Sequence, residues 1–280
     1  MSYIFLSVPI LDRPEFKMIF SMYQAIMSCK EHRVRLFVNE NDSLISRVRN
    51  VHISMFLNEY KDCDYFVSLD SDLEIVNCYH TNNIFTKLLS HDKDFVGALY
   101  ALKQPLGPPR TSSVPLDPTV ERTNIPFDKG LLPIRWLSAG CWCLKRSAVE
   151  KMVQSYPELN YVGDDNVTGK PIHGLYNPEI FDIEDGSTKM KFKKYLSEDW
   201  SFCQRFLDKG GEIFADTSIV LRHIGKIPYC LHNVEIQARK ANEIAPQSKP
   251  EVPLATRQFM PSAQPLPPAG FDLNKSINKG

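Results

Sequence analysis

The chain has 280 residues, enough for one large α/β domain with appendages, and its 43% hydrophobic and 24% charged residues are normal for a globular protein. Lysine and arginine total 33, as do aspartate and glutamate, so the formal net charge is zero. This balance argues against nucleic acid as an obligate partner, because binding along a phosphate backbone needs a basic excess. No apolar run approaches the roughly 18 residues of a membrane span, and the apolar start lacks the basic region and cleavage site of a signal peptide.

The seven cysteines are odd in number and scattered along the chain. Only Cys141 and Cys143 are close together, and a C-x-C pair without a second pair is a poor zinc signature. A scattered, odd set of cysteines is typical of reduced thiols, so we expect a reducing, cytoplasmic compartment.

Apolar strands and helices alternate along the first third of the chain. Strands are predicted at 3–8, 33–38, 65–69 and 95–102, and helices at 16–28, 43–60 and 82–90. In helix 16–28, the apolar residues that recur at helical spacing are Phe16, Ile19, Phe20, Tyr23, Ile26 and Met27. The alternation predicts an α/β fold with a doubly wound, mostly parallel sheet, helices on its faces and right-handed crossovers.

Two later stretches lack periodicity: 103–133, with seven prolines, and 156–194, with several glycines and prolines. Loops of this length inside a compact domain are usually functional. Between and after them we predict a strand, a turn and a helix within 137–152, and short strands at 212–215 and 218–221. A helix at 197–209 has Ser197 as its N-cap and Gly210-Gly211 at its left-handed end. Residues 233–280 are polar and proline-rich, which predicts an extended or disordered tail after a folded domain at 1–232.

Asp70 and Asp72 follow the strand predicted at 65–69 directly. In an extended chain, residues two apart project to the same side, so both carboxylates could reach one cation. Carboxylates suit Mg²⁺ or Mn²⁺, which also accept phosphate oxygens from a substrate. The alternative is a solvated turn, where aspartate is common. Ligands of parallel sheets bind at the carboxyl ends of the strands, and this position favours the metal site.

Glu198 and Asp199 open the helix predicted at 197–209. Acidic residues in a first turn complement the helix dipole, which is the simpler explanation. Alternatively, one of them is a general base that takes a proton from an attacking hydroxyl group. His223 follows a short strand, and a lone histidine there is either structural or the neutral imidazole that completes a metal site.

Arg47, Arg49 and Asn50 lie together on the helix predicted at 43–60. Two arginines on an early helix either form a solvated face, or neutralise a diphosphate or contact a base. A planar guanidinium pairs with phosphate through two hydrogen bonds. The small residues Ala139 and Gly140 enter an apolar strand. They indicate either a tight turn or close packing of backbone against a sugar ring.

Several signatures of other enzymes are absent from the sequence. No G-x-G-x-x-G follows the first strand, and there is no P-loop, H-E-x-x-H or G-x-S-x-G motif. Dinucleotide oxidoreductases, P-loop kinases, zincins and α/β-hydrolases therefore lose their main support.

Taken in order, five segments of the chain resemble the GT-A glycosyltransferases. They are 46–50 (SRVRN), 66–72 (FVSLDSD), 138–146 (SAGCWCLKR), 197–203 (SEDWSFC) and 221–225 (LRHIG), so the resemblance spans roughly residues 1–230. Each motif is common alone, and all five in this order are specific. The chain looks most like the small soluble glycosyltransferases of large algal viruses (chloroviruses), which build capsid glycans. A xylosyltransferase in the host cytoplasm is the expectation that follows.

The resemblance implies a UDP-linked sugar donor, a glycan or glycoprotein acceptor, and Mn²⁺ or Mg²⁺ at the donor's diphosphate. Asp72 and His223 would ligate the metal, with Asp70 on the metal or on the ribose. Asp199 would be the general base of an inverting transfer, and Glu198 is the other candidate. The implied donor contacts are Pro9, Asn39, Arg47, Asn50, Asp70, Ser71, Ala139 and Gly140. The loops 103–133 and 156–194 would frame the acceptor.

Two other functions compete with this one. A sugar-phosphate nucleotidyltransferase would need a glycine-rich phosphate loop after the first strand, and residues 9–14 read PILDRP instead. A non-catalytic glycan-binding module would tolerate the loss of Asp72, Asp199 and His223, and all three are present.

Overall fold

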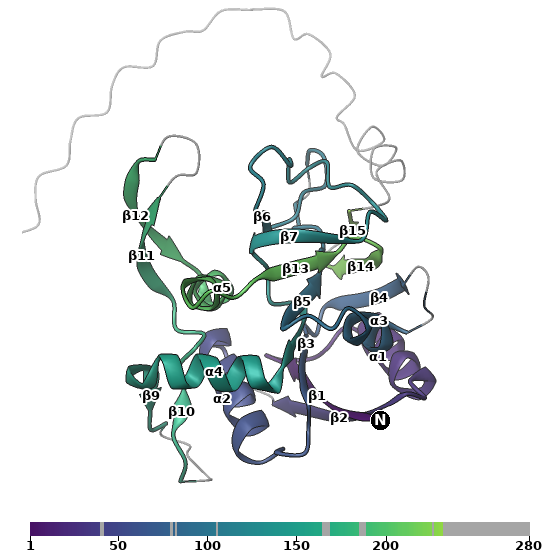
Figure 1. The fold of residues 1–280 in the computed structure, drawn as a ribbon. Coiled ribbons are helices and arrows are strands. Elements are labelled where there is room, and N and C mark those ends of the chain that lie inside the picture. Colours follow the sequence, from purple (N-terminus) through teal and green to yellow (C-terminus); the bar gives the residue numbers. More distant parts are fainter. Residues whose placement is uncertain are drawn as a thin grey trace, which may run out of the picture. The chain divides into compact units, whose positions relative to one another are not determined.

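The computed structural model describes residues 1–39, 42–78, 81, 83–104, 106–163, 169–184, 189–225 and 227–231. The tail predicted at 233–280 lies outside the described residues. At the centre is an eight-stranded sheet in the order β2-β1-β3-β8-β5-β13-β7-β6 (Figure 1). Its strands are β1 (Ser2–Pro9), β2 (His32–Asn39), β3 (Tyr65–Leu69), β5 (Phe95–Ala98), β6 (Val114–Pro115), β7 (Leu131–Trp136), β8 (Cys141–Lys145) and β13 (Ile213–Asp216).

The predicted α/β fold with a mostly parallel sheet is confirmed. Strands β2, β1 and β3 are parallel, and β8 runs antiparallel between β3 and β5, so that β5 points the same way as β3. Strand β13 is parallel to β5, and β7 is antiparallel to β13. The chain leaves β1 for β2 on one side and returns to β3 on the other, which makes the β1–β3 boundary the switch in strand order.

Helices cover both faces of this sheet, as the alternation of strands and helices predicts. On one face, α1 (Phe16–Ser28) and α3 (Ile84–Ser90) pack on the side of β1 that bears Ile4 and Leu6. On the other face, α2 (Ile45–Asn58), α4 (Arg146–Ser155) and α5 (Glu198–Asp208) pack on the side that bears Phe5. All three strand residues are fully buried, because a strand inside the sheet presents alternate side chains to the two layers.

Helix α1 has the predicted bounds, but it buries the opposite face. Met18, Met22 and Ala25 are buried, whereas Phe16 and Phe20 are 77% and 53% exposed and stack on each other. The physical reason is the close approach of α1 to β4 (Leu73–Cys78), where the Ser21 hydroxyl accepts a hydrogen bond from the Ile75 backbone at 3.0 Å. The buried face carries the small Ser21 and Ala25 and the flexible, unbranched Met18 and Met22, which fit such a close contact without an aromatic ring.

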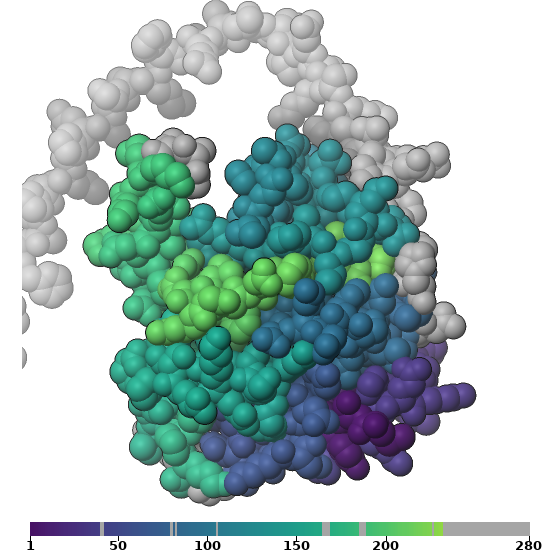
Figure 2. All heavy atoms as spheres, in the orientation of Figure 1, coloured from purple at the N-terminus to yellow at the C-terminus, as the bar shows by residue number. Residues whose placement is uncertain are grey.

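Smaller sheets extend the domain. Strand β14 (Ile219–Ile224) pairs with β4 on one side and with β15 (Pro228–Cys230) on the other, all antiparallel. Residues 156–194, predicted to be irregular, contain the hairpin of β11 (Glu179–Glu184) and β12 (Lys191–Leu196). They also contain η1 (Pro157–Leu159), β9 (Asn160–Tyr161) and β10 (Ile172–His173). In the space-filling view the hairpin stands apart from the segment before β7, with a notch between them (Figure 2).

Helix α5 has the predicted position, with one difference at its start. Ser197 has the extended backbone of an N-cap residue, but its hydroxyl donates to Asp199 and makes no capping hydrogen bond. At the other end, Gly210 has a φ of 76°, the left-handed conformation predicted there. Ser197 therefore orients a carboxylate in addition to starting the helix.

Two further expectations from the sequence concern reduced cysteines and the absence of a membrane span. All seven cysteines are free, and each of them except Cys29 is buried. Among the described residues, no helix is long and apolar enough to cross a membrane.

His52 links α2 to the sheet and makes the stability of the fold depend on pH. Its ring is fully buried and bonds to the Ser7 hydroxyl at 2.7 Å and to the Asn39 side-chain oxygen at 2.6 Å. Because Asn39 Oδ1 can only accept, His52 Nε2 carries the proton and Nδ1 accepts from Ser7. Burial, together with the positive charge of Arg49, lowers the pKa of His52 to about 3.

We expect His52 to cost the fold about 2 kcal/mol between pH 7 and pH 5. The unfolded chain binds a proton at this residue below about pH 6.5, whereas the folded chain does so only near pH 3. Protonation therefore favours unfolding increasingly as the pH falls through this window. Urea denaturation of the wild type and His52→Gln at both pH values tests this. A wild type that loses no more stability than the variant would contradict it.

Candidate functional site

The switch in strand order forms a pocket of about 240 Å³ at the carboxyl ends of β1 and β3. The start of α2 and the turn after β3 close it. Its lining residues are Pro9, Ile10, Leu11, Asp42, Ser43, Ile45, Val48, Arg49, Asp70, Ser71 and Asp72. The pocket thus contains both aspartates of the 70–72 motif and two of the other predicted donor contacts, Pro9 and Ser71.

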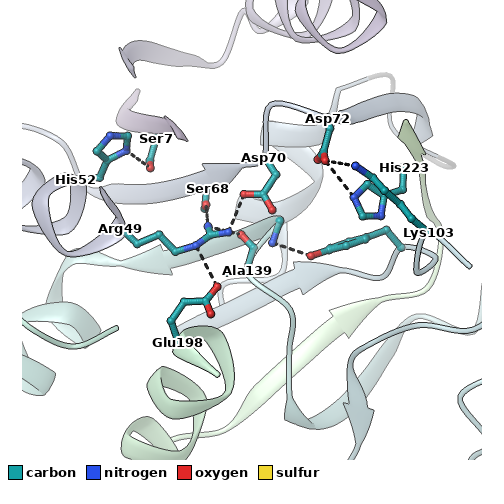
Figure 3. Close-up of polar contacts among 12 residues, drawn as sticks. Ser7, Arg49, His52, Ser68, Asp70, Asp72, Lys103, Ala139, Glu198 and His223 are labelled. Atoms are coloured by element: carbon teal, nitrogen blue, oxygen red, sulfur yellow. Dashed lines mark hydrogen bonds and ion pairs between the residues drawn. The ribbon is translucent and has the colours of Figure 1, made fainter. Parts of the chain in front are cut away.

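Extended-chain geometry predicts that the side chains of Asp70 and Asp72 project to the same side, but in the structure they point in different directions. The chain turns immediately after β3, and the Leu73 backbone donates to the Asp70 carbonyl at 3.1 Å. Asp70 consequently faces α2, where its Oδ1 accepts a hydrogen bond from Arg49 at 2.9 Å, whereas Asp72 faces β14 (Figure 3). The two carboxylates have different neighbours and therefore different electrostatic environments.

Arg49 is the residue that joins the two acidic segments of the site. Its side chain is 6% exposed, pairs with Asp70 at 2.9 Å and lies 3.7 Å from Glu198 (Figure 3). It also donates to the Ser68 hydroxyl and the Ala139 carbonyl, each at 3.3 Å. Burial alone would lower the pKa of Arg49, and the two carboxylates outweigh it and raise the pKa. The guanidinium is therefore a fixed positive charge inside the site.

Sequence reasoning selected Arg47 instead of Arg49 from the same helix. Residues two apart on an α-helix are about 200° apart around its axis, so only one of the two arginines can face the sheet. Arg47 lies on the outer side, 55% exposed, and pairs with Asp42 at 2.7 Å. Asp42 lines the pocket, so Arg47 borders the pocket indirectly.

Asn50 and Asn39, two other predicted donor contacts, have protein partners. The Asn50 side chain donates to Asn177 and accepts from the Tyr176 backbone, both at 2.8 Å. Asn39 accepts from His52 at 2.6 Å. Neither asparagine lines the pocket described above. Contact of these residues with a donor stays a prediction.

Ala139 and Gly140 lie beside the aspartate motif because β8 pairs with β3 in a register that sets Cys141 opposite Leu69. The Asp70 backbone donates to the Gly140 carbonyl at 2.8 Å. Glycine is required at position 140, since a Cβ there would lie 2.6 Å from the Tyr100 hydroxyl. The tight approach fixes the turn that carries Asp70.

Asp72 and His223 meet because β4 and β14 pair in antiparallel register, with His223 opposite Leu73. Oδ2 of Asp72 lies 3.3 Å from Nε2 of His223 and 2.5 Å from Nζ of Lys103 (Figure 3). His223 Nδ1 donates to the Ala101 carbonyl at 2.8 Å, which directs Nε2 toward the carboxylate. Burial would raise the pKa of Asp72, but its contacts with His223 and Lys103 lower it.

The Asp72–His223 pair fits a divalent cation in part. It offers one carboxylate oxygen and one imidazole nitrogen, and the carbonyl behind the ring is the partner that metal-bound histidines usually have. Asp70 is turned toward Arg49, and no group of three potential ligands exists within the part of the chain that the structure describes. Such a pair suits Mn²⁺ or Mg²⁺, which take water and substrate phosphate as their remaining ligands.

Glu198 and Asp199 lie at the N-terminus of α5, next to Arg49. Asp199 Oδ1 accepts hydrogen bonds from the Ser197 hydroxyl and, at 2.8 Å, from the Trp200 backbone. Burial raises the pKa of Asp199 and, together with the negative charge of Asp199, raises the pKa of Glu198. Carboxylates with raised pKa values are better proton acceptors than solvated ones.

A cationic aromatic cluster that includes Trp200, the residue after Asp199, lies where α5, β7 and the hairpin meet. Trp200 stacks on Trp136 with ring centroids 5.0 Å apart. Lys194 Nζ lies 4.4 Å from the Trp136 ring centroid and 5.3 Å from that of Trp200, and Arg135 lies 4.6 Å from Trp136. Sequence reasoning assigned no role to these four residues, which come from three separate segments.

Comparison with known proteins gives structural similarities only. No protein-family model and no curated protein matches the chain. The chain is similar to A197 from STIV, with 16% sequence identity and a TM-score of 0.48 over 81% of this chain and 87% of that chain. It is also similar to a glycosyltransferase involved in the glycosylation of the major capsid of PBCV-1, with 13% identity and a TM-score of 0.30 over 54% of this chain. That match covers 65% of the PBCV-1 protein, just under two thirds.

Proposed function

We propose that this chain is a GT-A glycosyltransferase that transfers a sugar from a UDP-sugar donor to a hydroxyl group of a glycan acceptor. The sequence resemblance suggests xylose as the sugar, and capsid glycosylation in a host cytoplasm as the setting. The observation that carries the proposal is the position of Arg49 between Asp70 and Glu198. Arg49 holds the aspartate motif, which lines the proposed donor pocket, beside the acidic start of α5, which would carry the general base. A sugar transfer needs the donor and the base close together.

The donor would bind in the pocket between β1, α2 and the turn after β3. Pro9, Ile10 and Leu11 offer an apolar wall for a nucleotide base, and Ser71 lies beside the aspartates. On the other side, Arg49 lines the pocket directly, and Arg47 borders it through its ion pair with Asp42. The polar and apolar walls meet at the sheet edge, where α/β proteins bind nucleotides.

Asp72 and His223 would hold Mn²⁺ or Mg²⁺ on the donor's diphosphate. A divalent cation bound there would offset the negative charge that develops on the departing nucleoside diphosphate. Asp70 would remain with Arg49 and reach the ribose or a metal-bound water. This division of roles follows from the turn at 70–73, which separates the two carboxylates.

Asp199 would act as the general base of an inverting transfer. The Ser197 hydroxyl and Trp200 backbone fix one carboxylate oxygen. The other oxygen, Oδ2, makes no hydrogen bond within the described part of the chain. It is available to accept the proton of the attacking acceptor hydroxyl. Glu198 lies against Arg49 and would hold the guanidinium of Arg49 in place.

The acceptor would approach from the cluster of Trp200, Trp136, Lys194 and Arg135. Trp200 follows the base directly, and its ring, backed by Trp136, offers a flat apolar surface of the kind on which sugar rings pack. The hairpin β11–β12 and the segment before β7 border the notch seen in Figure 2. The acceptor would then reach Asp199 beside Trp200.

A thermal-shift screen of nucleotide sugars, with and without Mn²⁺, tests the donor and metal assignments. We expect one UDP-sugar to raise the melting temperature in the presence of Mn²⁺, because a ligand that binds only the folded chain stabilises it. Asp72→Asn should lose the Mn²⁺-dependent part of the shift. Stabilisation by free glycans and by no nucleotide would instead favour a glycan-binding module. An Asp72→Asn shift equal to that of the wild type would contradict the metal assignment.

A further inference from the structure

Lys103 places a positive charge on the carboxylate of Asp72, one of the two proposed metal ligands. Its Nζ lies 2.5 Å from Oδ2 of Asp72, the same oxygen that faces Nε2 of His223 at 3.3 Å. In Figure 3, Lys103 and His223 approach the carboxylate together. An ammonium and a divalent ion both need the lone pairs of this oxygen, and they repel each other at such distances. Occupancy by one therefore excludes the other.

The position of Lys103 is defined by its surroundings. The backbone just before it is tied to the same site, since the Leu102 backbone donates to the Arg110 carbonyl and the Ala101 carbonyl accepts from His223, both at 2.8 Å. The lysine stem runs past Gly225, where a Cβ would lie 3.2 Å from its Cδ. The segment that orients the histidine thus also delivers the ammonium.

Lys103 can also leave this position. Its side chain is 38% exposed and ends in a strongly hydrated point charge on a flexible four-carbon stem. A diphosphate carries more negative charge than one carboxylate and would bind in the neighbouring pocket that Asp72 lines. A bound diphosphate would therefore offer the ammonium a better partner than Asp72.

We propose that Lys103 is a tethered cation that exchanges with the divalent ion. In the free protein it neutralises Asp72, and when donor and ion bind, the ion takes Asp72 and His223 while the ammonium moves to the diphosphate. The inference rests on the proposed function, because it takes the donor to be a nucleoside diphosphate sugar. Its consequence is cooperativity: an ion alone must displace Lys103 without compensation, so ion and nucleotide each strengthen the binding of the other.

Electron paramagnetic resonance of unbound Mn²⁺ measures this exchange directly, without any activity assay. Mn²⁺ binding is compared for the wild type, Lys103→Met and Lys61→Met, each with and without UDP, after subtraction of the Mn²⁺ that UDP binds without protein. Titration calorimetry measures the binding of UDP to the same three proteins. We expect UDP to tighten Mn²⁺ binding to the wild type at least tenfold. Lys103→Met should bind Mn²⁺ alone about tenfold more tightly than the wild type, and UDP should tighten its Mn²⁺ binding by a smaller factor than in the wild type. Lys61→Met removes an exposed lysine before β3 and should match the wild type.

Three results would overturn the exchange of Lys103 with the ion, and they differ in what they imply for the proposed function. Equal Mn²⁺ affinity of the wild type and Lys103→Met without UDP would overturn it and leave the proposed function intact. Binding of UDP but of no Mn²⁺ by all three proteins would also remove the metal from the proposed function. Binding of UDP by none of them would overturn the donor assignment itself.

Discussion

Asp199→Asn is expected to lower the turnover number about 10³-fold, within the range that general-base catalysis contributes. Asparagine keeps the shape of the side chain and can still accept the hydrogen bonds that Ser197 and Trp200 donate to Oδ1. It cannot take the proton of the attacking hydroxyl. Donor affinity should therefore change less than about threefold, as measured by titration calorimetry with the UDP-sugar.

The pH dependence of turnover is a second test of Asp199 as the general base. Burial raises the pKa values of Asp199 and Glu198, so the acidic limb of the turnover profile should lie above the usual carboxylate range. Activity falls as the pH drops through this limb, because the base becomes protonated. Glu198→Gln is the matched control and should keep a larger share of the activity. If Asp199→Asn lost donor affinity and kept normal turnover, the base role would be wrong.

Arg49→Met is expected to cost the fold about 3–5 kcal/mol, the usual effect of removing one partner of a buried ion pair. Methionine keeps much of the buried volume but leaves Asp70 and Glu198 without their shared counter-charge. Chemical denaturation at pH 7 measures the loss. Arg47→Met is the matched control on the same helix, and removal of its half-exposed pair with Asp42 should cost less than about 1 kcal/mol.

A rescue experiment separates charge from packing at Arg49. Combining Arg49→Met with Asp70→Asn and Glu198→Gln removes the uncompensated negative charges, and we expect it to restore more than half of the lost stability. The triple variant should remain inactive, because the donor and acceptor segments are no longer held together. Equal stabilities of Arg49→Met and Arg47→Met would show that Arg49 does not organise the site.

Most of the central sheet could be predicted from the sequence because these strands are short apolar runs separated by helices of regular period. Strands β6 and β7 are the exception, since they fall within or at the end of 103–133, which was predicted to be irregular. Strand β3 and helix α1 have the predicted bounds. The hairpin β11–β12 could not be predicted in the same way. Strand β12 carries lysines at 191, 193 and 194, and most of its residues are exposed, so the hydrophobic pattern that marks a strand is weak there.

The site was predictable only where it follows directly from a strand. Asp70 and Asp72 follow the end of β3, and their place at the sheet edge follows from the alternation of elements. Their orientations depend on the turn at 70–73 and on the pairing of β4 with β14. Strand β4 was not predicted. This long-range register brings His223 to Asp72, and no local pattern reveals it.

The two positively charged residues of the site, Arg49 and Lys103, could not be identified from local sequence patterns either. Helical geometry establishes that Arg47 and Arg49 face different sides, but only the packed structure shows that Arg49 is the buried one. Lys103 belongs to a proline-rich stretch without periodicity, and its contact with Asp72 spans 31 positions. Its role follows from the positions of charges in space.

Proton magnetic resonance of the reaction tests the central claim most directly. The folded protein is incubated with Mn²⁺, UDP-sugars including UDP-xylose, and free sugars as acceptors, and the anomeric protons are followed with time. We predict that one donor is consumed, that UDP is released, and that the first sugar product has the anomeric configuration opposite to that of the donor. Asp199→Asn should show none of this. Consumption of no UDP-sugar by the wild type would contradict glycosyl transfer, and a product with retained configuration would contradict the role of Asp199.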